Sequence, residues 1–133
     1  MSEVIARHLR RWATEPFAWG TTDCCLVLAD YVLDVTGRDG ASHLRGRYTS
    51  KAGCNRVSGF LKRGLAAVVG ECAAAAGLPA CDAPQRGDIG VLQFDERVCA
   101  GALCLGPRRW AIKSPDGLLT IDRDHIAAWS VRG

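Results

Sequence analysis

The residue pattern changes abruptly at Pro84–Asp88, and this change constrains the fold more than any other feature of the chain. Before it, apolar side chains recur at helical spacing, and after it short apolar runs alternate with turn residues. A run of helices followed by a run of strands is typical of an α+β fold. The chain has 133 residues, which is the length of one domain, so we expect a single domain over residues 1–133.

The helical half is expected to contain one central helix. Residues 2–13 have the apolar spacing of an amphipathic helix, whereas the run that follows Asp23 is apolar on nearly every side as far as Leu33. A helix that is apolar all round is buried. Thr22 or Asp23 is suited to cap its first turn, and Gly37 is expected to end it.

The rest of this half is predicted to be a loop and two further helices. Residues 38–49 have the composition of a loop. Residues 51–62 are predicted to form a helix whose inward side chains are Val57, Phe60 and Leu61. A second, alanine-rich helix is expected over residues 65–76.

The C-terminal half is predicted to be a meander of antiparallel strands on which the N-terminal helices pack. Its apolar runs are short and are separated by turn residues such as Gly106-Pro107. The predicted strands are residues 89–94, 101–105, 110–112, 118–121 and 127–131.

Composition excludes several classes of function. The net charge is +3 and the arginines are scattered, whereas a nucleic-acid-binding protein more often has a dense basic stripe with aromatic residues. No stretch approaches the ~20 apolar residues that span a bilayer, so we expect no membrane insertion. The first residues lack the apolar block of a signal peptide, which indicates synthesis and folding in a cytoplasm.

Seven cysteines are many for a chain of this length. They contain no C-x-x-C pair, and no His lies at zinc-finger spacing from a Cys pair, so we expect no metal and no cofactor. Most of the seven are expected to be buried small hydrophobes. Disulfides are the alternative if the protein acts outside a cell, for example on a virus particle.

Cys24 is the candidate nucleophile. A cysteine in the first turn of a helix lies near free backbone N–H groups and the positive end of the helix dipole, and both favour the thiolate. The same N–H groups could bind an oxyanion, and Gly20 would let a substrate approach. In the alternative interpretation, Cys24 and Cys25 are two small residues of an apolar helix and Asp23 is only its cap; spacing alone favours this interpretation.

The order of motifs resembles the NlpC branch of the papain-like cysteine peptidases. Asp23-Cys24 matches the Asp-Cys that opens the central helix of those enzymes, most of which cleave peptide bonds in bacterial cell walls. Gly87–Val91 and Gly101–Gly106 are similar to the two strands that follow it. The resemblance implies a papain-like α+β fold with Cys24 as the nucleophile.

A closer likeness is to a small uncharacterised NlpC-like family of bacteriophages and prophages, often encoded among tail genes. The likeness covers most of the chain. It implies synthesis in a bacterial cytoplasm, incorporation into a virion, and other phage tail proteins as partners. The segments that carry it are Phe17–Gly20, Asp23-Cys24, Thr36-Gly37, Leu44–Tyr48, Gln85–Asp88, Cys104–Gly106, Pro115–Leu118 and Ala128-Trp129.

The chain departs from the peptidase pattern at the general base. The pattern places the catalytic His at the start of the second strand, where this chain has Cys99, Ala100 and Gly101. His125, which Asp122 or Asp124 could orient, and His43 in the loop are the candidate bases. For both, and for His8 on the first helix, a structural or surface role is the preferred interpretation.

Two functions therefore remain open. The favoured one is a virion or tail-associated NlpC-like domain with a degenerate active site, whose cysteines could pair to toughen a particle. The alternative is a cysteine hydrolase in which Cys24 attacks an amide of peptidoglycan during phage entry. Trp19, Trp110 and Trp129 could line a cleft for a glycan or peptide, although core packing is the default for Trp.

Overall fold

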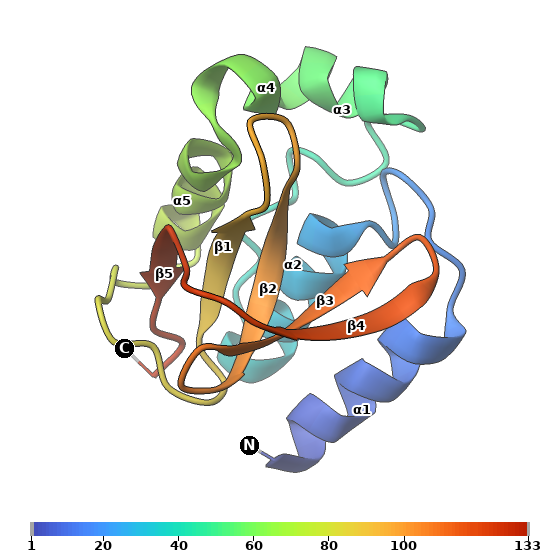
Figure 1. Ribbon diagram of the computed structural model, residues 1–133. Helices are drawn as coiled ribbons and strands as arrows, with labels where there is room; N and C mark the ends of the chain where they lie inside the picture. Colours follow the sequence, from blue (N-terminus) through green and yellow to red (C-terminus); the bar gives the residue numbers. More distant parts are fainter. Residues whose placement is uncertain (1, 133) are drawn as a thin grey trace.

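The computed structural model describes residues 2–132 and confirms the α+β fold, with helices in the N-terminal half and an antiparallel sheet in the C-terminal half (Figure 1). The helices are α1 (Ser2–Thr14), α2 (Cys24–Thr36), α3 (Lys51–Ser58), α4 (Phe60–Arg63) and α5 (Leu65–Ala75). The strands are β1 (Ile89–Gln93), β2 (Cys99–Gly106), β3 (Arg109–Ser114), β4 (Gly117–Asp122) and β5 (Ala127–Trp129).

The strand order is β4-β3-β2-β1-β5. Successive hairpins join β1 to β4, so these four strands form the predicted meander. The chain then crosses back and adds β5 to the free edge of β1, with Ile89 opposite Trp129. This return places β5 away from β4, its neighbour in sequence (Figure 1).

Helix α2 is the central helix of the fold. It contacts β2, β3 and α1, and Figure 1 shows it behind the middle of the sheet. Leu26, Val27 and Tyr31 of α2 are buried against sheet residues such as Val91 and Leu103. Asp23 caps the helix, and Gly37 ends it with a left-handed backbone (φ 76°). The apolar run, its cap and its stop were all predicted from the sequence.

The predicted helix over residues 51–62 is wrong as a single element. It breaks at Gly59, whose φ of 72° is left-handed, into α3 and the short helix α4. One helical wheel therefore cannot describe the segment. Phe60 is buried as expected, but Val57 and Leu61 are 45% and 52% exposed, so their predicted inward orientation is also wrong.

His8 is a structural residue of the helical layer. Its side chain is buried, its Nε2 lies 2.8 Å from a carboxylate oxygen of Asp34, and its ring meets Tyr31 edge-on. Trp110 and Trp129 are buried as well. Within residues 2–132, none of the helices is long and apolar enough to cross a membrane.

Candidate functional site

A pocket of about 280 Å³ opens at the first turn of α2, where Cys24 and Cys25 line it. Its walls come from the loop before α2, from α3 and α4, and from the β1–β2 hairpin and β3. They are mostly aromatic and aliphatic, and Phe17 and Trp19 meet edge to face in one of them. The apolar wall residues are Phe17, Trp19, Phe60, Leu65, Phe94, Val98, Ala100, Ile112 and Leu119.

Asp23 holds the first turn of α2 in place. The carboxylate is buried, and its Oδ1 accepts hydrogen bonds from the backbone N–H groups of Cys25 (3.2 Å) and Leu26 (3.0 Å). Its Oδ2 accepts from the Gly20 N–H (2.9 Å) and the Tyr48 hydroxyl (2.8 Å). One side chain thus joins the helix start to two loops that are far apart in sequence.

The two loops meet at Gly20. Its φ is 89°, and a Cβ there would lie 2.0 Å from the carbonyl oxygen of Tyr48, which no side chain could tolerate. The Gly20 carbonyl also accepts from the N–H of Gly46 (2.9 Å). Gly20 is therefore needed for loop packing, which brings Tyr48 to Asp23.

Cys24 is the activated thiol of the pocket. A hydrogen bond from the Cys25 thiol lowers the pKa of Cys24, and the Gly101 backbone N–H lowers it further. Burial and the charge of Asp23 act in the opposite direction, but the pKa remains below the ordinary value of a thiol. Cys24 is thus the cysteine most easily converted to a nucleophilic thiolate.

Cys25 shares a hydrogen bond with Cys24 in which either thiol can donate, and Cys25 is the donor when Cys24 is a thiolate. Its Sγ lies 3.9 Å from the Sγ of Cys24, and donation to Cys24, together with burial, raises the pKa of Cys25 well above its usual value. The backbone of Gly101 in β2 packs against it, since a Cβ built at Gly101 would lie 3.4 Å from Cys25 Sγ. Cys25 therefore remains a protonated thiol where Cys24 is a thiolate.

Two further thiols, Cys54 and Cys99, line the same pocket. Burial raises the pKa of each, and the charge of Cys24 adds to this effect in both. Cys99 is the first residue of β2. All seven cysteines of the chain are free thiols.

Three cationic side chains, Lys51, Arg97 and Lys113, also line the pocket. Lys113 is only 2% exposed, and its ammonium donates to the carbonyl oxygens of Trp12 (2.6 Å) and Glu15 at the end of α1. A cation at a helix C-terminus is favourably placed in the helix dipole. Lys113 thus anchors α1 to β3 and borders the pocket.

The structure does not bring any of the three histidines to this pocket; His8, His43 and His125 are all absent from its lining. His125 lies instead beside the ring of Trp110, 5.9 Å between centroids, and His43 is exposed in the loop before Tyr48.

The carboxylates proposed to orient His125 are paired elsewhere. Asp124 accepts a hydrogen bond from Arg108, and Asp122 pairs with Arg109. Both contacts are exposed ion pairs on the β3–β4 side of the sheet. The acid–histidine pair that triad chemistry requires is therefore not assembled at His125.

The family described as "Domain of unknown function (DUF6950)" matches residues 2–131. The chain belongs to this family. The match spans both the helical half and the sheet, so the pocket of this DUF6950 chain lies inside the matched region. No curated protein and no solved structure matches the chain.

Sequence reasoning identified Cys24, Asp23 and Trp19, all of which line the pocket, but missed most of its other residues. Tyr48 ends the segment Leu44–Tyr48, which was noted only for its likeness to phage NlpC-like chains. Nothing in that segment indicates a hydrogen bond to Asp23. Cys99 and Lys113 reach the pocket through strand register, which the sequence does not specify. Within the described residues 2–132, no group of three or more His, Cys, Asp and Glu side chains could hold a metal ion.

We predict that Cys25→Ala raises the pKa of Cys24, because it removes the S–H donor that stabilises the thiolate. Cys25→Ser is the matched control, since its hydroxyl can still donate. Iodoacetamide labelling of Cys24 across pH, read by peptide mass spectrometry, measures the change. The alanine variant should need a higher pH for half-maximal rate than wild type, and the serine variant should lie closer to wild type. Equal profiles for all three proteins would contradict the role given to Cys25.

Proposed function

We propose that this chain is an NlpC-like component of a bacteriophage tail that keeps the thiol pocket of a cysteine peptidase but does not hydrolyse amides. The resemblance of its motifs to phage tail-encoded NlpC-like chains supports the phage assignment. Its role in the particle is then structural or in assembly, with other tail proteins as partners.

The residues that line the Cys24 pocket are the main evidence that this chain does not hydrolyse amides. A cysteine hydrolase needs a base to activate water for release of the acyl group, and general base catalysis contributes ~10²–10⁴-fold. No histidine lines the pocket, and the stretch that corresponds to the base of the peptidase pattern is Cys99, Ala100 and Gly101, of which Cys99 and Ala100 line the pocket. The carboxylate of Asp23 is occupied by four hydrogen bonds, so it is poorly placed to take that role.

The apolar walls support a binding role for the same pocket. A concave, largely apolar site with a few polar groups is the usual form of a ligand site. Val98 and Leu119 are exposed parts of its lining, and Lys51 and Arg97 add positive charge. An apolar side chain of a partner protein, flanked by a carboxylate, matches this combination.

The alternative function, a hydrolase of peptidoglycan amides, is favoured by one specific observation. The pKa of Cys24 is lowered and its sulfur borders an open pocket, as a nucleophile requires. In that function Cys24 attacks the amide, the helix N-terminus binds the oxyanion, and His125 or His43 must move to the pocket to act as base.

Hydrolysis of purified peptidoglycan separates the two functions. Sacculi and soluble muropeptides are incubated with wild type and with Cys24→Ala, and the released products are measured by mass spectrometry. We expect no product that depends on Cys24. Products released by wild type and not by Cys24→Ala would overturn the proposal in favour of the hydrolase.

A variant with an added imidazole tests whether the start of β2 can serve as a base position for Cys24. Cys99→His places an imidazole in the pocket, and an adjacent imidazole favours the thiolate. Labelling of Cys24 by iodoacetamide at pH 6 should rise by about tenfold or more. Cys81→His, outside the pocket, is the control and should not change the rate. An unchanged rate in a folded Cys99→His protein would show that Cys99 does not occupy a base position.

The tail assignment has its own test. Particles are purified on a density gradient from the bacterium that carries the gene, and their proteins are identified by mass spectrometry. We expect the chain to co-migrate with tail proteins. Its presence only in the soluble cell extract would contradict the assignment.

A further inference from the structure

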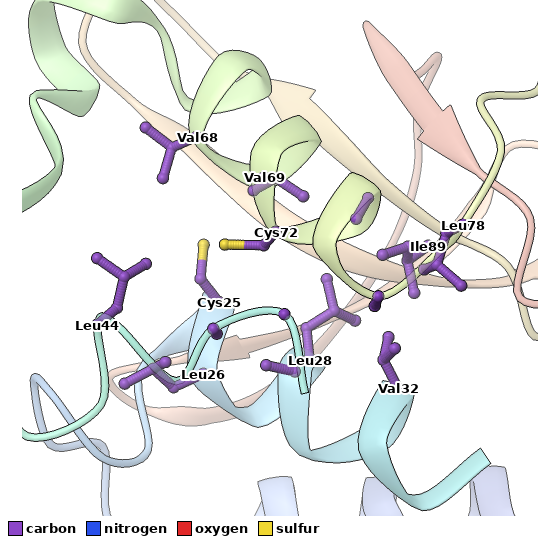
Figure 2. Close-up of a pocket in the computed structure, with 15 residues that line it drawn as sticks. Cys25, Leu26, Leu28, Val32, Leu44, Val68, Val69, Cys72, Leu78 and Ile89 are labelled. Carbon is purple, nitrogen blue, oxygen red and sulfur yellow. The ribbon is translucent and has the colours of Figure 1, made fainter. Parts of the chain in front are cut away.

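A second, smaller pocket lies between α2 and α5, behind the Cys24 site. Its volume is about 50 Å³, and aliphatic side chains such as Leu28, Val68 and Ile89 surround it. Two thiols also line it: Cys25 from α2 and Cys72 from α5. Figure 2 shows their side chains pointing toward one another across the space between the two helices.

The backbone around both thiols is tightly held. On one side, Gly101 of β2 lies against Cys25. On the other, a Cβ at Gly40 would lie 1.9 Å from the carbonyl oxygen of Cys72, so the loop after α2 rests directly on α5 at this residue. Both cysteines are only partly buried, and both helices are packed against the sheet. The two thiols therefore face each other from rigid supports.

We propose that Cys25 and Cys72 are a redox-active dithiol pair, which a low-molecular-weight disulfide such as oxidised glutathione converts into a covalent link between α2 and α5. Burial raises the pKa of Cys72, and the hydrogen bond with Cys24 together with burial raises that of Cys25, so each thiol reacts through a small thiolate fraction that grows with pH. The Cys72 thiolate attacks one glutathione sulfur, forms a mixed disulfide and releases the first glutathione as a thiolate. Cys25 then loses its proton, its thiolate attacks the Cys72 sulfur, and the second glutathione leaves as a thiolate. Two protein thiols are oxidised, and one glutathione disulfide is reduced to two thiols.

Oxidation of this pair acts on the neighbouring site. Cys25 in a disulfide has no S–H proton, so it can no longer donate a hydrogen bond to Cys24. Burial and the charge of Asp23, which both raise the pKa of Cys24, are then opposed mainly by backbone N–H groups. The link between α2 and α5 thus makes Cys24 less reactive at neutral pH.

The link is tested directly in Cys24→Ser/Cys81→Ser protein. In this background trypsin yields residues 12–38 with Cys25 as their only cysteine and residues 64–86 with Cys72 as theirs. The folded protein is equilibrated in buffers of increasing oxidised-to-reduced glutathione ratio, quenched with acid and mapped without reduction. We expect the disulfide-linked peptide pair to become the main species, and to disappear when Cys72→Ala is added. Free or only glutathionylated Cys25 and Cys72 in the most oxidising buffer would overturn the proposal, as would pairing of Cys25 with Cys54 or Cys99.

The effect on Cys24 is tested in Cys81→Ser protein that retains Cys24. Glutathione is removed after oxidation, and labelling is scored by intact mass only on molecules that carry no bound glutathione, because Cys24 can itself form a mixed disulfide. Oxidation should lower the rate of Cys24 labelling at pH 7 by about threefold or more, because the thiolate fraction controls the rate. Cys72→Ala/Cys81→Ser is the matched control, and its rate should be the same in reducing and oxidising buffer. An unchanged rate in the linked protein would contradict the coupling of the two sites.

Discussion

The buried carboxylate of Asp23 is the interaction on which the site depends. It caps α2 through two backbone N–H groups and holds the loops of Gly20 and Tyr48 through two more donors. A carboxylate that is removed from water is tolerated only when such donors surround it. The same four bonds place Cys24 at the start of the helix, at the edge of an open pocket, so helix formation and site geometry have one origin.

The charge of Asp23 also raises the pKa of Cys24, because a neighbouring negative charge disfavours a thiolate. The Cys25 thiol and the Gly101 N–H compensate by donating to Cys24. The balance yields an activated sulfur without an imidazole. Such a sulfur can react with small electrophiles, but no histidine lines its pocket to activate water, which is why we propose binding or assembly rather than hydrolysis.

Local signals in the sequence are sufficient to predict much of the fold. The apolar run of α2, its Asp23 cap and its Gly37 stop are all short-range features, as are the turn residues between strands. The break at Gly59 was missed because glycine was read as part of a helix and not as a left-handed stop. The return of β5 to β1, the contact of Tyr48 with Asp23 and the position of Lys113 at the end of α1 depend on long-range packing. No pattern of neighbouring residues encodes those contacts.

The immediate neighbours of Cys24 lower its pKa, and none of the three histidines lines its pocket. The most direct measurement is the pH profile of Cys24 alkylation in wild type and in the His43→Ala/His125→Ala double variant. We expect superimposable profiles, both with an apparent pKa below that of an ordinary thiol. A double variant that loses the reactivity of Cys24 at low pH would instead show that an imidazole reaches the pocket and activates the thiol.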